Sequence, residues 1–202
     1  MAQLSVDQAA DALGVSNMQI GRLIDAGELE ARRFGRSWSI DPDSLRRYRF
    51  LRPRRGRPLS EQAAWHRVLD AEAPANIDEA IDLARLVRRR SRNERLRILP
   101  DFDGRIDDDP RVHHGGARAA IHYGAGIGRP DQRDIYIGAS DADSFRTEYR
   151  ANPTAGDPNV VLRVVEEPMV FGDKFVPPIV AVLDLLDAAD TRAAAEALRV
   201  RR

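Results

Sequence analysis

The sequence predicts an α+β protein that begins with a winged helix-turn-helix, and three observations support this. Two short amphipathic patterns of helical period lie close together within residues 4–26, a hairpin pattern follows at residues 29–40, and strand-like alternation starts near residue 93. A chain of 202 residues, 43% of them hydrophobic, is long enough for one or two domains with proper cores. Because it has no cysteine, a disulfide framework and a thiolate metal site are excluded.

The first helix is predicted to start at Ser5 and to end at Gly14. The Ser5 hydroxyl can cap free backbone amides, and Gln8, three residues on, can complete a capping box. Gly14 tolerates the left-handed conformation of a tight helix exit, and Ser16 is placed to cap a second helix. Two helices joined so closely must cross steeply, as they do in a helix-turn-helix.

The second helix, residues 17–26, is predicted to have one apolar face. Spacings of three and four place on that face Ile20, Leu23 and Ile24. Polar residues at the start of the helix and on its remaining surface can reach base edges, so the candidates for DNA contacts are Ser16, Asn17, Gln19 and Arg22.

A basic hairpin is predicted after this helix, which Gly27 is expected to end. Residues 29–34 and 37–40 have the composition of two short strands around a Gly-Arg turn at residues 35–36. The hairpin has the position of a wing, and its candidates for backbone contacts with DNA are Arg32, Arg33 and Arg36.

The whole stretch resembles the excisionase and MerR-like winged helix-turn-helix family. Members share a short-turn motif, an Ala-Gly-Glu-Leu segment and a basic hairpin with a Gly-Arg tip and an aromatic residue. The matching segments here are residues 26–29, residues 32–36 and Trp38. The resemblance implies that residues 17–26 enter the major groove, while Arg33 and Arg36 touch phosphate or the minor groove. The alternative is a helix-turn-helix used only for protein contacts, and the wing arginines argue against it.

A third helix is expected to begin at Asp41, a capping residue that is followed by a proline. Its apolar residues are expected to point inward, namely Leu45, Tyr48 and Leu51. Its basic residues are expected to point outward, namely Arg46, Arg47, Arg49 and Arg52.

Residues 53–58 cannot form regular helix, because they contain two prolines and a glycine. The segment Arg55-Gly56-Arg57-Pro58 resembles the AT-hook, which implies an extended Arg-Gly-Arg in a narrow A·T minor groove. A solvated basic linker is the equal alternative. In both cases Arg54, Arg55 and Arg57 strengthen binding to any duplex, because residues 45–58 hold seven arginines and no acid.

The formal net charge of +0 hides an uneven distribution. Residues 1–59 carry eleven Arg against seven Asp and Glu, whereas residues 101–202 carry thirteen Lys and Arg against eighteen Asp and Glu. Phosphate contacts come from a local patch, so a neutral chain does not argue against DNA binding.

The rest of the chain is predicted to be a mixed α+β domain. Its first helix is expected to present to a partner surface Ala64, Trp65, Val68 and Leu69, with Trp65 in the core and not in a ligand-stacking role. Helices are expected over residues 59–69, 77–90, 141–149 and 178–186, the last with an extension over 191–198. Ser60 and Ser140 are the expected caps of the first and third of these. Strands are expected around residues 96–98, 135–137 and 160–165, with a fourth over 117–123. The basic run at residues 88–92 is expected to be a solvated helix end or a second phosphate contact.

These segments, in this order, resemble actinobacterial antitoxins of the AbiEi type, which are paired with a nucleotidyltransferase toxin in type IV toxin-antitoxin systems. Besides the winged helix, the likeness rests on residues 55–65, 134–151, 159–167 and 177–198. It covers most of the chain, although the excisionase-type winged helix departs from the commoner pattern and leaves the operator geometry open. The resemblance implies an antitoxin that represses its own operon and counteracts a toxin encoded beside it.

Sequence patterns for a catalytic or metal-binding site are weaker than those for DNA binding. The histidines at positions 66, 113, 114 and 122 have neither zinc-site spacing nor a nucleophile motif beside them, and residues 113–116 are expected to form a turn. Residues 101–106 resemble the middle of an EF-hand calcium loop, but Leu99 and Pro110 occupy the positions where such a loop needs oxygen ligands. The glycine repeat at residues 124–128 lacks the Lys-Ser/Thr of a phosphate loop. We therefore expect no catalytic residue, metal or cofactor.

The sequence thus predicts a DNA-binding repressor with a DNA-binding domain at residues 1–52, a basic linker at 53–58 and a C-terminal domain at 59–202. Its expected partner is double-stranded DNA with repeats in its own promoter, bound by a homodimer or a cooperative assembly. Two alternatives stay open: a protein-interaction module whose C-terminal domain binds a toxin directly, and an excisionase-like architectural protein. Neither a signal-peptide pattern nor a bilayer-spanning run is present, so we expect a cytoplasmic protein without membrane contact.

Overall fold

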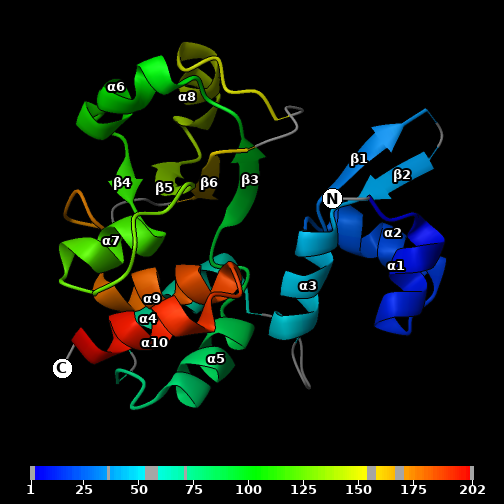
Figure 1. The fold of residues 1–202 in the computed structure, drawn as a ribbon, viewed down its shortest axis with the longest axis horizontal. Coiled ribbons are helices and arrows are strands. Elements are labelled where there is room, and N and C mark those ends of the chain that lie inside the picture. The colour runs from blue at the N-terminus through cyan, green and yellow to red at the C-terminus, as the bar shows by residue number, and fades with distance from the viewer. Residues whose placement is uncertain are drawn as a thin grey trace. The chain divides into compact units, whose positions relative to one another are not determined.

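The chain folds into two compact units, within residues 1–54 and within residues 55–202, in the computed structural model (Figure 1). The structure describes residues 3–35, 37–52, 59–70, 72–153, 158–166 and 171–200. Each unit has its own hydrophobic core. Both helices and strands are present, with a helix-turn-helix in the first unit and a four-stranded sheet in the second, which confirms the predicted α+β class.

The described residues of the first unit form three helices and one hairpin. In chain order its elements are α1 (Val6–Leu13), α2 (Asn17–Asp25), β1 (Ala31–Phe34), β2 (Ser37–Ile40) and α3 (Pro42–Leu51). The hairpin is antiparallel, with Ala31 opposite Ile40, and Leu4 extends it by backbone hydrogen bonds to Ile40 of 3.0 and 2.8 Å. The first strand starts two residues later than predicted, because the Leu29 amide still donates a hydrogen bond of 3.2 Å to the Leu23 carbonyl of α2.

Local capping interactions set the turn between the first two helices. The Ser5 hydroxyl accepts a hydrogen bond of 3.2 Å from the Gln8 amide, and the Gln8 side chain accepts one of 2.8 Å from the Ser5 amide. Gly14 ends α1 in the left-handed conformation at φ +64°, and Ser16 caps α2 through the amide of Gln19. The predicted capping box and short turn are confirmed, so the steep crossing of α1 and α2 follows from local sequence.

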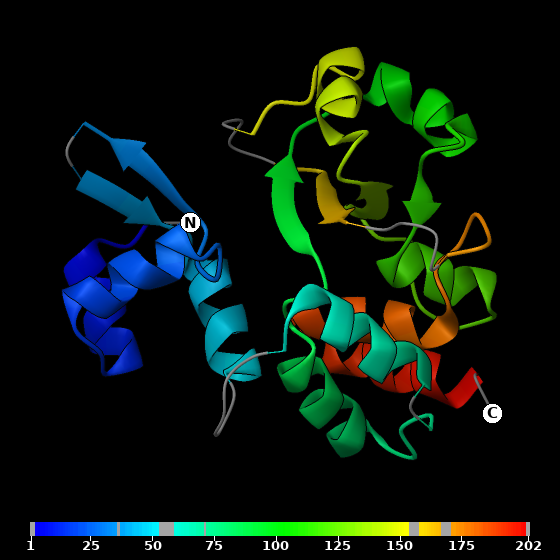
Figure 2. The ribbon, with the colours of Figure 1, turned by 180° about the vertical axis from the view of Figure 1, so that it is seen from behind.

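The second unit contains a four-stranded sheet with helices on both faces (Figures 1 and 2). Its strands are β3 (Arg92–Leu96), β4 (His113–His114), β5 (Arg133–Gly138) and β6 (Val160–Val165). Its helices are α4 (Glu61–Asp70), α5 (Ile77–Leu86), the 3-10 turn η1 (Pro100–Phe102), α6 (Asp103–Asp108), α7 (Gly116–His122), α8 (Ala142–Glu148), α9 (Pro178–Asp187) and α10 (Thr191–Val200). The strand order is β3-β6-β5-β4, in which the central pair β5 and β6 is parallel and the outer pairs are antiparallel.

Alternation along the central strands divides their side chains between the two faces of the sheet. Ile135 and Leu162 lie side by side in the register and face the apolar core beneath α6 and α8. Tyr136 and Arg163, the next pair, face the opposite side, where Tyr136 packs edge-on against Trp65 of α4 at 6.1 Å. Trp65 is therefore a core residue, as predicted.

Two predicted elements near residues 113–123 are wrong. Residues 117–123 were expected to form a strand, but residues 117–122 lie in α7 and Tyr123 is its C-cap. The segment is rich in alanine, the strongest helix former. Residues 113–116 were expected to be only a turn, but His113 and His114 form β4, which pairs with β5. The helix α6 was not predicted at all.

Smaller corrections concern helix ends and exposure. The helix from Ile77 ends at Leu86, not at residue 90, so the arginine run lies beyond it. Ser140 does not cap α8, because Asp141 occupies the capping position. Leu69 is exposed, whereas the other three residues of its predicted face, Ala64, Trp65 and Val68, are buried. Residues 191–198 are not an extension of the preceding helix, because Ala189 at φ +59° breaks the chain into separate helices.

Candidate nucleic-acid interface

The outward face of α2 is opposite its two buried residues. Ile20 and Leu23 are buried in the core of the first unit, and Ile24 is half-buried. The side chains that remain exposed along α2 are Asn17, Met18, Arg22 and Asp25. Of these, Met18, Arg22 and Asp25 lie together on one side of the helix, because they follow the spacing of three and four.

The predicted base-contacting residues have different environments. The Ser16 hydroxyl is used as the cap of α2. Asn17 donates a hydrogen bond of 2.6 Å to the Asp7 carboxylate of α1, which ties the two helices together. Gln19 is half-buried at the edge of the face. Arg22 is exposed, and among these four residues it is therefore the one best placed to contact DNA.

The wing presents its two described arginines on opposite faces of β1. Arg32 is half-buried and lies opposite Ser39, whereas Arg33 is exposed and lies opposite Trp38. The Arg33 guanidinium is 5.9 Å from the centre of the Trp38 ring, which holds this cation over an aromatic face. The remaining candidates Arg36, Arg54, Arg55 and Arg57 lie outside the described residues, as does the segment that resembles an AT-hook.

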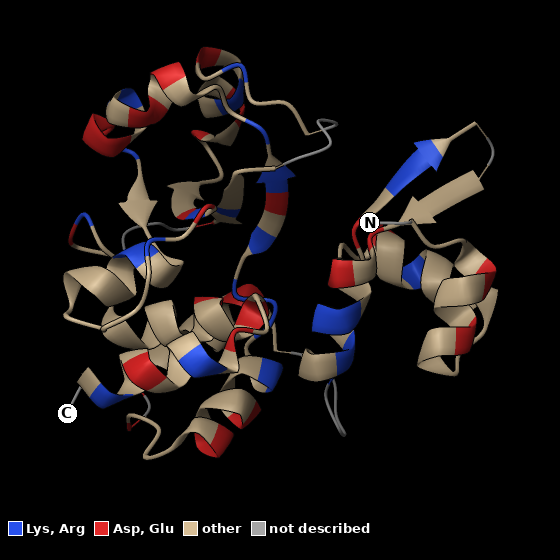
Figure 3. Cartoon of the chain, in the orientation of Figure 1, with Lys and Arg blue, Asp and Glu red and all other residues tan. Residues whose placement is uncertain are grey.

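The arginines of α3 do not all point outward as predicted. Arg47 is only 16% exposed and forms an ion pair of 2.8 Å with Glu30. Arg52 is exposed and donates to the Leu13 carbonyl at 3.3 Å. Arg46 and Arg49 are exposed, so α3 adds positive charge to the first unit (Figure 3). Such exposed guanidinium groups can bind phosphate oxygens without reading sequence.

Comparison with known proteins agrees with this geometry. Residues 4–49 match the sequence family described as a helix-turn-helix domain. An uncharacterized protein of Mycobacterium bovis is 34% identical over 94 residues, which are 46% of this chain and 82% of that protein. Uncharacterized proteins of two Mycobacterium tuberculosis strains match to the same extent. The chain belongs to the same family as these mycobacterial proteins.

The helix-turn-helix domain supports a DNA-binding regulatory role. The predicted resemblance to helix-turn-helix proteins is confirmed for this part of the chain. No solved structure matches the chain. Among the residues that the structure describes, none of the helices has the length and hydrophobicity needed to span a bilayer.

Sequence reasoning missed Met18, which the structure places on the outward face of α2. Its side chain is 69% exposed, whereas apolar residues were otherwise assigned to the core. A helical projection of residues 17–25 could have found it, because Met18 lies opposite Leu23 on that projection.

A buried ionic cluster in the second unit was also missed. It comprises Arg90, Asp134, Tyr136, Arg163, Asp184 and Asp187. Arg163 lies 2.8 Å from Asp134 and 2.7 Å from Asp187. Arg90 lies 2.8 Å from Asp184. The predicted solvated arginine run is thus wrong at Arg90, which is 0% exposed.

The cluster joins the sheet to α9. Tyr136 of β5 donates a hydrogen bond of 2.6 Å to Asp184 of α9, and the amide of Gly116 donates one of 3.0 Å to the same carboxylate. Gly116 has φ +52°, and a Cβ at this position would lie 2.4 Å from the Asp134 carboxylate, so only glycine fits without displacement. Burial raises the pKa of Asp134 to about 6. Because Arg90, Arg163 and Asp184 are shielded from solvent, we interpret the cluster as structural.

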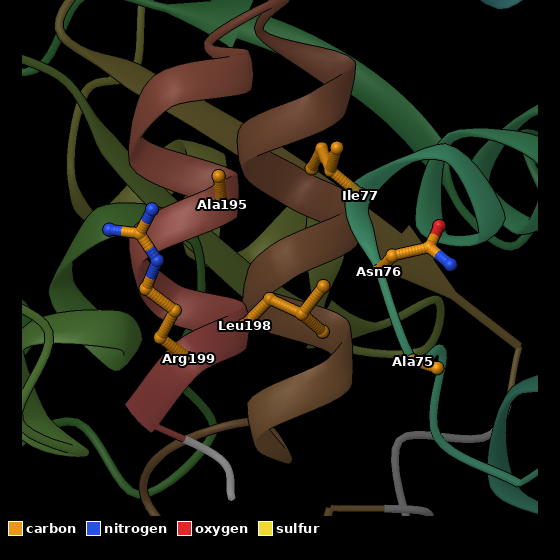
Figure 4. A pocket seen from close by; sticks show the side chains of 6 residues that line it. All are labelled: Ala75, Asn76, Ile77, Ala195, Leu198 and Arg199. Carbon is orange, nitrogen blue, oxygen red and sulfur yellow. The ribbon is translucent and has the colours of Figure 1, made fainter.

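A shallow pocket of about 240 Å³ lies between the start of α5 and α10 (Figure 4). Ile77 and Leu198 give it an apolar wall, and Arg199 lies at its edge. No group of three or more His, Asp or Glu side chains that could hold a metal ion occurs in the described part of the chain.

Proposed function

We propose that this protein is a sequence-specific repressor of its own promoter and the antitoxin of a type IV toxin-antitoxin system. The outward face of α2 beside the basic wing is the observation that carries the DNA-binding part. The antitoxin part is supported by the order of segments along the chain, which resembles antitoxins of the AbiEi type. The toxin would be a nucleotidyltransferase encoded beside this gene.

Base reading and phosphate anchoring would come from different parts of the helix-turn-helix domain. Arg22 projects from α2 and can donate to guanine O6 and N7 in the major groove. Arg33 projects from the wing and can bind phosphate or the minor groove. Bound at its promoter, the protein would exclude RNA polymerase. Since a single module of this size reads few base pairs, repeated sites or a dimer are needed for a selective operator.

A footprint of the full chain on the DNA upstream of its own gene tests the repressor function. We expect protection of two or more repeats with cooperative binding, because each domain alone reads too short a site. A duplex of the same composition with shuffled sequence serves as the control. Retention that is equally strong on both duplexes would contradict sequence-specific repression.

Co-expression of this chain with the toxin tests the antitoxin function. The neighbouring nucleotidyltransferase is expected to arrest growth when expressed alone and to be counteracted by this chain. Persistent arrest, with the chain present at a normal level, would contradict the antitoxin proposal without affecting the footprint. Co-purification of the two proteins would indicate direct binding by the C-terminal unit in place of action without a stable complex.

A further inference from the structure

The two most exposed large hydrophobic side chains of the described residues both belong to the helix-turn-helix domain. Met18 on α2 is 69% exposed, and Phe34 on the wing is 66% exposed. Single apolar side chains are common on protein surfaces, so the position of each one decides what it indicates. Met18 is the more informative of the two, because it lies at the start of the helix that is expected to enter the major groove.

The surroundings of Met18 leave the outward face of α2 open. Gly21 and Arg22 follow it at spacings of three and four, so all three residues share one side of the helix. A Cβ added at Gly21 would meet no atom within 4 Å, so packing inside the domain does not require glycine there. Glycine weakens a helix interior relative to alanine. Without a Cβ, Gly21 allows a ligand to approach this face of the helix closely.

Met18 also lies against a group suited to base recognition. Its sulfur is 3.6 Å from the Arg22 Nη2, so an apolar side chain and a fork of hydrogen-bond donors are adjacent. The major groove displays the same two chemistries: guanine has paired acceptors, and thymine has an apolar C5-methyl group. The methionine thioether is flexible and polarizable, which suits contact with a methyl group.

We propose that Met18 contacts thymine C5-methyl groups in the major groove and so selects thymine at one or two positions of the operator. This inference rests on the proposed DNA reading by α2, and it adds a residue that determines specificity. Cytosine lacks the methyl group, and so does uracil, which keeps the pairing groups of thymine. The contribution of Met18 can therefore be separated from that of hydrogen bonding.

The test uses the full chain and the duplex that it selects from a random-sequence library. Each thymine is replaced singly by deoxyuridine, and Kd is measured by fluorescence anisotropy. We expect about fourfold weaker binding by the wild type at one or two positions, the effect of one buried methyl group. Met18→Ala is expected to bind the thymine and deoxyuridine duplexes equally. Phe34→Ala, which removes a similarly exposed apolar side chain from the wing, is expected to keep the fourfold difference.

The outcomes separate this inference from the proposed function. If the wild type selects no sequence, DNA reading itself fails. If it selects a sequence but no thymine is sensitive to deoxyuridine, the assignment of Met18 is overturned while DNA reading stands. The same conclusion follows if Met18→Ala keeps the full difference. Far-UV circular dichroism is expected to be unchanged in both variants, because both side chains are exposed.

Discussion

Arg163→Met is expected to lower the free energy of unfolding of the second unit by about 3–5 kcal/mol. Methionine has a similar volume, so packing is largely kept while the charge is lost. After the change, the three carboxylates of the cluster, Asp134, Asp184 and Asp187, would share one guanidinium, that of Arg90. Uncompensated carboxylates in a buried site are costly because they have been removed from water.

Urea unfolding followed by Trp65 fluorescence measures this effect, in a Trp38→Phe background that removes the signal of the first unit. Trp65 is buried and packs against Phe171 at 5.2 Å, so its emission reports the core of the second unit. Arg199→Met is the matched control, because Arg199 is exposed and its ion pair with Glu196 lies at the surface. Its unfolding midpoint is expected to stay close to that of the wild type.

A second substitution tests whether charge causes the loss. Asp134→Asn in the Arg163→Met background removes one of the unpaired carboxylates and is expected to recover part of the stability. Equal stability of the single and double variants would contradict the electrostatic explanation. A loss of less than about 1 kcal/mol in Arg163→Met would contradict the importance of the cluster itself.

The wild type is expected to lose stability relative to His114→Phe as the pH falls from 6.5 to 4. His114 of β4 is 2% exposed, and its Nδ1 has no hydrogen-bond partner among the described residues. Burial, together with the positive charge of Arg118, lowers the pKa of His114 from 6.5 to about 4. The folded state therefore favours the neutral imidazole, whose stabilisation is complete above pH 6.5 and is lost as the pH falls through 4.

The expected size of this effect is about 3 kcal/mol, from the difference between the two pKa values. Asp134 has the opposite effect on the pH dependence of stability. Because its pKa is raised to about 6 in the folded state, it contributes fully to stability below pH 3.8, and this contribution is lost as the pH rises through 6. Both proteins contain Asp134, so the comparison with His114→Phe isolates the histidine. Ile137→Val, a change without titratable groups, is expected to cost a constant amount at every pH. A constant difference for His114→Phe as well would contradict the predicted role of His114.

The features that could be predicted from sequence are those encoded locally. The first helix and the turn are defined by contacts within four residues, which involve Ser5, Gly14 and Ser16. The helix-turn-helix could therefore be predicted from the sequence. The β-branched run at residues 160–165 likewise identified β6 over its whole length. Residues 117–123 mix alanine with isolated apolar residues, and this pattern is compatible with either a helix or a strand. Contacts with the rest of the fold determine which of the two forms.

The features that could not be predicted depend on contacts between distant residues. Arg90 and Asp184 are 94 positions apart, and nothing in the arginine run near residue 90 indicates which of its members is buried. Met18 was overlooked for a different reason, since an apolar residue in an amphipathic helix is normally assigned to the core. A helical projection with Ile20 and Leu23 on the buried face would have placed Met18 on the outward side.

The central claim is that α2 and the wing together bind DNA, and a binding titration of two arginine double variants tests it most directly. Arg22→Ala/Arg33→Ala removes one exposed arginine from each of these elements. Arg192→Ala/Arg199→Ala removes the same charge from exposed positions of α10 in the second unit. Each is compared with the wild type on the promoter duplex and on its shuffled counterpart, across a series of salt concentrations.

We expect the Arg22/Arg33 variant to bind the promoter duplex at least about tenfold more weakly, with a shallower salt dependence, because it loses one base contact and one phosphate contact. The Arg192/Arg199 variant is expected to bind like the wild type. Equal weakening of both variants, or a wild type that does not distinguish the promoter from the shuffled duplex, would contradict DNA reading by the helix-turn-helix domain.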